Sequence, residues 1–202
     1  MQMARRAKSI IRAALQGYGT DAVKRALWNH EFSGGRWACL ERTTGDFVYR
    51  YVEASANGGS ILDLGCGSGN TGTELLASSY SRYVGVDISD VAVAKAHARS
   101  VADGRAASNT YVRSDIVTYV PDRQYDVILF RDSIYYVRPR RHVSPTLERY
   151  AGYLTSSGVL IVRMYDVSGK YAAIVETIES RFHVVARDVT ASRAMVLVFR
   201  GR

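Results

Sequence analysis

Cysteine and long apolar segments are both scarce in this sequence. The 202 residues include two cysteines, Cys39 and Cys66, too few for a disulfide framework, which favours a reducing, cytoplasmic location. Charged or polar residues interrupt every apolar run before it is long enough to cross a membrane. Hydrophobic residues still make up 47% of the chain, as in soluble globular proteins. We therefore expect one cytoplasmic domain, residues 1–202, without a membrane span.

Acidic residues are outnumbered, because 27 lysines and arginines face 19 aspartates and glutamates, for a net charge of +8. Such a charge suits nucleic acid, an anionic lipid or a phosphorylated substrate, but also a solvated surface. The bases are spread along the chain without an RNA-binding signature, so the solvated surface is favoured narrowly. The first stretch, MQMARRAKSIIRAALQG, is basic and amphipathic like a transit peptide, and an amphipathic first helix is the preferred interpretation.

Strands and helices are expected to alternate from Ser60 onward, after about fifty mostly helical residues. The early helices are TDAVKRALWNHEF, which begins at Thr20 and Asp21, and a segment from about Trp37 to Glu53. The expected strands lie at 60–64, 82–89, 107–115, 125–130, 159–166, 183–189 and 193–200. The expected helices between them lie at 70–79, 90–103, from 143 to near 158, and at 170–182. This order predicts a mostly parallel sheet with helices on both faces and a closing antiparallel pair.

A glycine loop, ILDLGCGSGNTG at 61–72, follows the first expected strand. Gly65, Gly67 and Gly69 clear side chains from the carboxyl end of that strand, where ligands of α/β sheets bind. A dinucleotide loop, G-x-G-x-x-G, would place its third glycine where Asn70 stands. Asp63 would also repel a pyrophosphate, whereas it would attract the ammonium group of S-adenosylmethionine. The loop therefore favours S-adenosylmethionine over NAD.

Further acids follow the second and third expected strands. Asp87 stands 22 positions after Gly65 and is suited to accept hydrogen bonds from ribose hydroxyls, with either an S-adenosylmethionine or an NAD ligand. Asp115 and Ile116 are suited to the amino group and the ring of adenine. Together these residues indicate an adenosine-containing ligand.

The segments LDLGCGSG, VGVDIS, SDI, YDVILFRDSIYYV and LTSSGVLIV closely resemble those of class I S-adenosylmethionine-dependent methyltransferases, from about Ser60 to Asp166. The resemblance implies a three-layer α-β-α Rossmann-like fold with a seven-stranded, mostly parallel sheet of order 3-2-1-4-5-7-6, strand 7 being antiparallel. It also implies N-terminal lid helices, residues 1–55, over a cofactor-binding core, residues 56–202. S-adenosylmethionine would be the cofactor and S-adenosylhomocysteine its product. The expected cofactor-binding residues are Asp63, Gly65, Cys66, Gly67, Gly69, Asn70, Asp87, Ile88, Asp115, Ile116, Arg131 and Trp37.

The segment SGGRWACLE resembles part of bacterial small-molecule methyltransferases of this class. The resemblance implies that Trp37 covers the cofactor and that Arg36 meets its carboxylate, although core packing would also explain Trp37.

Several motifs that would identify the methyl acceptor are missing. After the fourth expected strand the chain reads FRDSIYYVRP instead of asparagine–proline–proline–aromatic, which disfavours the amino groups of nucleic-acid bases and of glutamine. No obvious pair of metal-binding acids is present, and lysines are too few for the lysine–aspartate–lysine–glutamate set of ribose methyltransferases. We therefore expect the oxygen or nitrogen of a small molecule or glycan as the acceptor, with no metal. RNA methylation, an NAD-linked oxidoreductase and a non-catalytic nucleic-acid-binding domain remain alternatives.

Candidate catalytic residues follow the fourth expected strand. His142 has a side chain suited to a general base near neutral pH, and Tyr136 and Asp132 are the other candidates. Tyr135 would form an aromatic wall of the acceptor pocket together with Tyr136. Nearby arginines would hold an acceptor carboxylate or phosphate at its rim; these are Arg138, Arg140 and Arg141.

Overall fold

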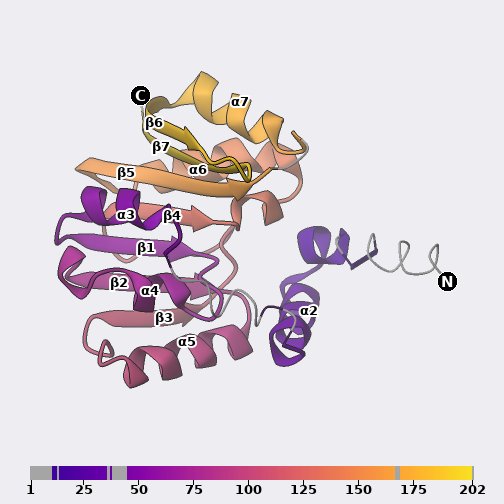
Figure 1. Ribbon diagram of the computed structural model, residues 1–202. Coiled ribbons are helices and arrows are strands. Elements are labelled where there is room, and N and C mark those ends of the chain that lie inside the picture. Colours follow the sequence, from indigo (N-terminus) through magenta and orange to yellow (C-terminus); the bar gives the residue numbers. More distant parts are fainter. Residues whose placement is uncertain (1–10, 13, 36, 38–44, 167–168, 202) are drawn as a thin grey trace.

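A seven-stranded sheet forms the centre of the computed structural model, which describes residues 11–12, 14–35, 37, 45–166 and 169–201 (Figure 1). Its order is β3-β2-β1-β4-β5-β7-β6, and β7 runs antiparallel to both β5 and β6. The strands are β1 Ser60–Leu64, β2 Arg82–Asp87, β3 Asn109–Arg113, β4 Tyr125–Arg131, β5 Leu154–Tyr165, β6 His183–Val189 and β7 Ala194–Arg200. The expected order and the expected antiparallel seventh strand are confirmed.

Helices cover both faces of the sheet and give the expected three layers (Figure 1). They are α2 Asp21–Ser33, α3 Tyr49–Ala56, α4 Asn70–Glu74, α5 Asp90–Ala102, α6 Val143–Ala151 and α7 Ala172–Arg181, and residues 11–12 and 14–18 are helical too. Successive strand residues point to opposite faces, so Ile61 packs with α3 while Leu62 packs with α6 and α7. Each face of the sheet therefore has its own apolar core. None of the described helices is long and apolar enough to span a membrane.

Three of the expected helices have other boundaries in the structure. The helix expected at 70–79 ends at Glu74, and a short 3₁₀ turn follows at Ala77–Ser79. The helix expected from Trp37 to Glu53 begins only at Tyr49 within the described residues, because the Asp46 side chain accepts a hydrogen bond from the Val48 amide in a turn. The helix expected to run to near Gly158 ends at Ala151, and β5 already begins at Leu154. Leu154 pairs with Tyr125 and Val159 pairs with Val127, so a bulge in β5 between these two pairs accommodates residues 155–158. Hydrophobic periodicity alone did not separate this irregular strand from the end of a helix.

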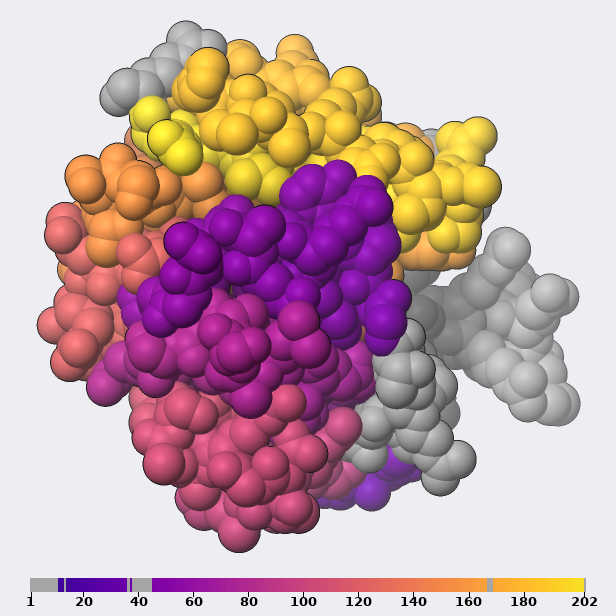
Figure 2. Space-filling model, turned by 60° about the vertical axis from the view of Figure 1, so that its left-hand side comes forward, coloured from indigo at the N-terminus to yellow at the C-terminus, as the bar shows by residue number. Residues whose placement is uncertain are grey.

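The carboxyl ends of β1, β2 and β4 point toward α2, which lies beyond that edge of the sheet (Figure 1). Figure 2 shows the face on which α3 and the residues just before it, in violet, pack between the yellow C-terminal part and the magenta segment that follows α3 in the chain. The sheet thus presents its strand ends to the N-terminal helix, and the space between them is where the fold positions a site.

Candidate functional site

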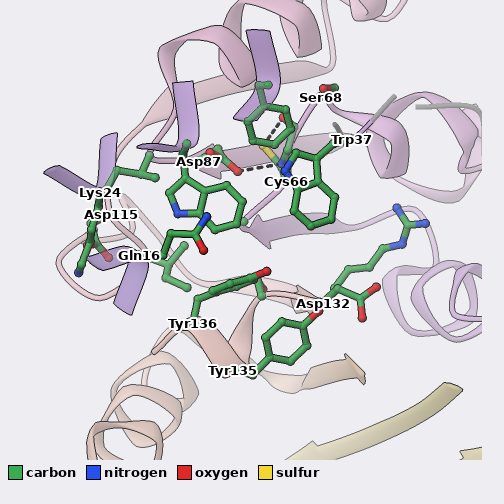
Figure 3. A pocket seen from close by; sticks show the side chains of 18 of the residues that line it. Gln16, Lys24, Trp37, Cys66, Ser68, Asp87, Asp115, Asp132, Tyr135 and Tyr136 are labelled. Carbon is green, nitrogen blue, oxygen red and sulfur yellow. Dashed lines mark hydrogen bonds and ion pairs between the residues drawn. The ribbon is translucent and has the colours of Figure 1, made fainter. Parts of the chain in front are cut away.

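A cavity of about 490 Å³ lies at the carboxyl ends of the strands, beneath α2 (Figure 3). This volume is within the usual range of small-molecule sites. From the core, the cavity is lined by Gly65, Cys66, Gly67, Ser68, Asn70, Asp87, Ile88, Asp115, Ile116, Arg131, Asp132, Ser133, Tyr135, Tyr136, Arg163 and Tyr165. From the N-terminal part it is lined by Gln16, Lys24, Trp28, Phe32 and Trp37. The structure thus brings together ten of the twelve residues expected to bind the cofactor.

The three glycines of the loop have positive φ angles and different surroundings. A Cβ on Gly65 would come within 2.5 Å of the Ser133 Cβ, and one on Gly69 within 2.7 Å of the Ala96 Cβ. A Cβ on Gly67 would lie 3.5 Å from the Phe32 ring and would meet no other atom within that distance. Gly65 and Gly69 therefore permit close packing within the protein, whereas Gly67 keeps backbone open at the cavity.

Asp63 lies behind the glycine loop and does not line the cavity. Its Oδ2 accepts a hydrogen bond of 2.6 Å from the Tyr83 hydroxyl. Burial raises the pKa of this carboxyl, against the opposing effects of the Tyr83 hydrogen bond and the Arg131 charge. Gly69 is also absent from the lining. These two of the expected cofactor-binding residues thus support the loop from behind instead of facing the cavity.

Asp87 ends β2 and lines the cavity, as expected. The Gly67 amide donates to its Oδ2 at 3.0 Å, and the Ser89 amide donates to its Oδ1 at 2.9 Å. Burial raises the pKa of this carboxyl to about 6, against these hydrogen bonds. At pH 7 the group is therefore mostly ionised and fixed in place as a hydrogen-bond acceptor.

Asp115 lies at one end of the cavity, where Lys24 meets it from α2 (Figure 3). The Lys24 Nζ is 2.9 Å from Asp115 Oδ2, and the Val117 amide donates to Oδ1 at 2.8 Å. Both side chains of the ion pair are largely buried. The N-terminal helix thus contacts the acid that the sequence assigned to adenine.

Further polar contacts fasten α2 to the start of α5. Asn29 accepts a hydrogen bond from the Ser89 hydroxyl at 2.7 Å and donates to Asp90 at 3.0 Å. Arg25 forms a more exposed ion pair with Asp90 at 2.5 Å. These contacts hold α2 over the cavity, and Trp28 and Phe32 are thereby directed at it.

Charged residues form a cluster at the other end of the cavity. Arg131 donates to Asp46 Oδ2 from Nε at 3.0 Å and from Nη2 at 2.9 Å. Arg163, which is the register partner of Arg131 on β5, pairs with Asp132 Oδ2 and lies 3.5 Å from Asp46. Burial raises the pKa of Asp132, and the charges of Arg163 and Arg131 oppose this rise. Two arginines and two aspartates thus balance each other's charge at the ends of β4 and β5.

Aromatic side chains surround this cluster. Tyr136 makes an edge-on contact with Trp28, with 4.9 Å between ring centroids, and Trp28 lies 6.1 Å from Trp37. Tyr135 contacts Tyr136 at 4.9 Å and stacks on Tyr171 at 4.7 Å. The expectation that Tyr135 and Tyr136 line the cavity together is therefore met.

His142 and the neighbouring arginines lie outside the cavity. The His142 side chain is exposed on a short 3₁₀ turn before α6, so the structure does not support its expected role as a general base. Arg138 packs against Gly17, and Arg140 donates to the Lys170 carbonyl. Arg141 is exposed. None of the three arginines lines the cavity.

Several residues that line the cavity were not predicted from the sequence. Arg163 and Tyr165 end the fifth strand, and their place at a parallel strand's carboxyl end is a signal that could have found them. Lys24 and Gln16 carry no such signal, because their approach depends on how the N-terminal helices fold over the sheet. Arg36 lies outside the described residues. The part of the chain that the structure describes holds no group of three or more histidine, cysteine, aspartate and glutamate side chains placed to bind a metal.

Comparisons with known proteins agree with this geometry. Residues 62–160 match the family model of the methyltransferase domain. No protein with a curated description matches the chain in sequence. Solved structures with the same fold include a 1,6-didemethyltoxoflavin N1-methyltransferase from Burkholderia thailandensis with S-adenosylhomocysteine bound, at 15% identity, TM-score 0.74, and coverage of 89% of this chain and 88% of that one.

Two further structures show the same likeness. The magnesium protoporphyrin IX methyltransferase of Synechocystis, with S-adenosylmethionine bound, is 19% identical, with TM-score 0.63 and coverage of 96% and 97%. The N-methyltransferase NodS of Bradyrhizobium japonicum, with S-adenosylhomocysteine bound, is 16% identical, with TM-score 0.64 and coverage of 84% and 87%. Residues 62–160 are thus a methyltransferase domain, and the glycine loop and strand order give the chain the fold of the class I, S-adenosylmethionine-dependent methyltransferases.

Proposed function

We propose that the chain transfers the methyl group of S-adenosylmethionine to an oxygen or nitrogen of a small molecule bound in the cavity beneath α2. The observation that carries this proposal is the shared wall of Gly67 and Asp87, an open backbone beside a fixed carboxylate. When bound, S-adenosylmethionine would supply a methyl group activated by its sulfonium. A lone pair of the acceptor would attack this methyl carbon in line with the sulfur, which would leave.

The residues present fit this ligand. Asp87 offers ionised oxygens to the ribose hydroxyls, and Ile88 and Ile116 offer apolar surface to the adenine. Asp115 would accept from the adenine amino group while its Oδ2 accepts from Lys24. Asp63 would act only through the loop, since Tyr83 holds it behind Gly65. The ligand would therefore lie along the loop, with adenine at the Asp115 end.

Residues 1–55 were expected to form a lid over a core of residues 56–202, but α3 packs against β1 within the core. We therefore propose α2 as the part of the N-terminal region that acts as the lid. The support is that α2 contributes Lys24, Trp28 and Phe32 to the cavity and is attached through Asn29 to the start of α5. Closure of this segment would exclude water and align the acceptor with the methyl group. Such positioning can lower a barrier by roughly 7–11 kcal/mol.

The acceptor is proposed to be small, because α2 and Trp37 cover the cavity that the strand ends open. The acceptors named for two structural neighbours, 1,6-didemethyltoxoflavin and magnesium protoporphyrin IX, are consistent with a small acceptor. A duplex nucleic acid would need an open approach to the strand ends, where α2 lies.

Calorimetric titration with S-adenosylhomocysteine tests the proposal. We expect binding to the wild-type chain and to Asp103→Ala, a control with an exposed acid outside the cavity. Asp87→Ala and Asp87→Asn should bind far more weakly while giving the circular dichroism spectrum of the folded protein. Unchanged affinity in both folded Asp87 variants, or a preference for NAD, would contradict the proposed function.

A further inference from the structure

The end of the cavity opposite the Lys24–Asp115 pair combines a carboxylate with aromatic walls (Figure 3). Asp132 follows β4 with φ of 55°, a left-handed conformation that is costly for a residue other than glycine. Its Oδ2 is paired with Arg163, and the nearby Tyr135 hydroxyl opposes the rise in the pKa of this carboxyl. Its Oδ1 is buried and has no hydrogen bond of ordinary geometry among the described residues. A buried acceptor oxygen without a donor is unfavourable, so this atom is suited to a donor brought by a ligand.

The rings beside Asp132 favour a particular kind of donor. Tyr135 and Tyr136 lie on the same short turn, and Trp28 meets Tyr136 edge-on from α2. Faces of such rings attract cations, most strongly those of tryptophan, and they also pack against planar apolar groups. A hydroxyl acceptor would yield a neutral ether, which gains nothing from this attraction. An amine acceptor gives a cationic product, which the rings and the carboxylate both stabilise.

We propose that the acceptor is a primary or secondary amine on an aromatic skeleton, with its nitrogen held by Asp132 Oδ1 and its ring packed among Trp28, Tyr135 and Tyr136. This inference rests on the proposed function and names its substrate class. An ammonium group would donate to Asp132 on binding and then lose one proton to solvent. The freed nitrogen lone pair forms the new N–C bond as the C–S bond breaks, and the sulfur retains that bonding pair. The products are a methylammonium, S-adenosylhomocysteine and the released proton, so charge and atoms balance.

The two tryptophans of the chain, Trp28 and Trp37, both line this cavity. Fluorescence excited at the red edge of tryptophan absorption therefore reports on whether the cavity is occupied. The probes are phenethylamine and 2-phenylethanol, which share a skeleton and differ only in the amine and hydroxyl groups. Each is titrated into protein saturated with S-adenosylhomocysteine, and calorimetry provides an independent affinity. We expect phenethylamine to bind more than about tenfold more tightly than 2-phenylethanol, because one hydrogen bond to a charged group has an effect of this size on affinity.

The Asp132→Asn variant should lose this preference, with the ratio of the two affinities falling to about one, while its affinity for S-adenosylhomocysteine is retained. Asp103→Asn, an exposed acid outside the cavity, is the matched control and should keep the wild-type ratio. A second variant, Tyr136→Leu, should weaken phenethylamine more than 2-phenylethanol, and it decides the matter if Asp132→Asn does not fold.

Equal binding of the two probes to the wild-type chain, or binding of neither, would overturn the amine proposal while leaving the methyltransferase assignment intact. Failure of S-adenosylhomocysteine itself to bind would instead contradict the proposed function. The two failures are therefore distinguishable in one series of titrations.

Discussion

Substituting alanine at Gly67 and at Gly69 should produce opposite kinds of defect, although both glycines have positive φ angles of 54° and 80°. A left-handed alanine costs about 1–2 kcal/mol, and the lower entropy of its unfolded chain returns about 0.4–1 kcal/mol. For Gly67→Ala this is nearly the whole effect, because the new methyl group lies 3.5 Å from the Phe32 ring. We expect a loss of about 1 kcal/mol in the free energy of unfolding.

Gly69→Ala carries an additional cost. Its methyl group would lie 2.7 Å from the Ala96 Cβ and 2.9 Å from the Ala96 Cα, so α5 itself must shift. Overpacking of this kind costs about 1–3 kcal/mol. Added to the backbone strain, it gives a total loss of about 2–4 kcal/mol. Since 1 kcal/mol corresponds to about 2–4 °C in a domain of this size, the melting temperature of Gly69→Ala should lie several degrees below that of Gly67→Ala.

Ligand affinity should show the reverse order. The Gly67 methyl group lies at the cavity wall, so Gly67→Ala should lose at least about tenfold in affinity for S-adenosylhomocysteine if about 1.4 kcal/mol of contact is lost. Gly69→Ala, titrated well below its melting temperature, should keep near wild-type affinity because Gly69 does not line the cavity. Thermal melts and calorimetry provide the two readouts. Equal melting temperatures, or an affinity defect confined to Gly69→Ala, would refute this division of roles.

The remaining predictions concern pH, the N-terminal helix and the excluded base. Because ribose hydroxyls donate to ionised Asp87 and burial raises its pKa to about 6, affinity for S-adenosylhomocysteine should level off above about pH 7 and fall by up to about tenfold per unit below pH 6. Titration across pH 5–8 checks this, and a flat profile would disprove it. Lys24→Met should speed hydrogen exchange in α2 by removing a largely buried pair, whereas Arg25→Met should change it little because its pair is exposed; equal effects would contradict the contrast. His142→Ala should leave turnover unchanged, and a large loss in a labelled-methyl assay would restore His142 to the mechanism.

Residues placed at strand ends were the most predictable part of the site. Gly67 and Asp87 stand at the ends of strands with clear apolar character, and Asp115 follows the weaker strand β3. Parallel strands bring their carboxyl ends to one edge of the sheet. The sheet order was predictable only from the family resemblance. The length of β5 was less predictable, because its bulge opposite Tyr125 interrupts the periodicity.

Side-chain direction and the fold of the N-terminal segment were not predictable in the same way. Asp63 stands two residues before Gly65, but side chains along a strand point alternately to the two faces of the sheet. The Asp63 side chain therefore meets Tyr83 and does not face the cavity. His142 follows the aromatic turn closely in sequence, yet the chain turns outward before it. Lys24 meets Asp115 across 91 positions, and no local pattern encodes such a contact.

The charged contacts of the N-terminal segment have a consequence for the timing of the reaction cycle. Lys24 fixes one end of the segment to Asp115, and Asp46 fixes the other end to Arg131. A molecule that leaves by displacing α2 separates such charges, which then become exposed to counterions. The screening length shortens from about 10 Å at 0.1 M salt to about 3 Å at 1 M, so salt stabilises the separated charges more than the largely buried pairs. We therefore expect product dissociation, followed by stopped-flow tryptophan fluorescence, to accelerate with ionic strength.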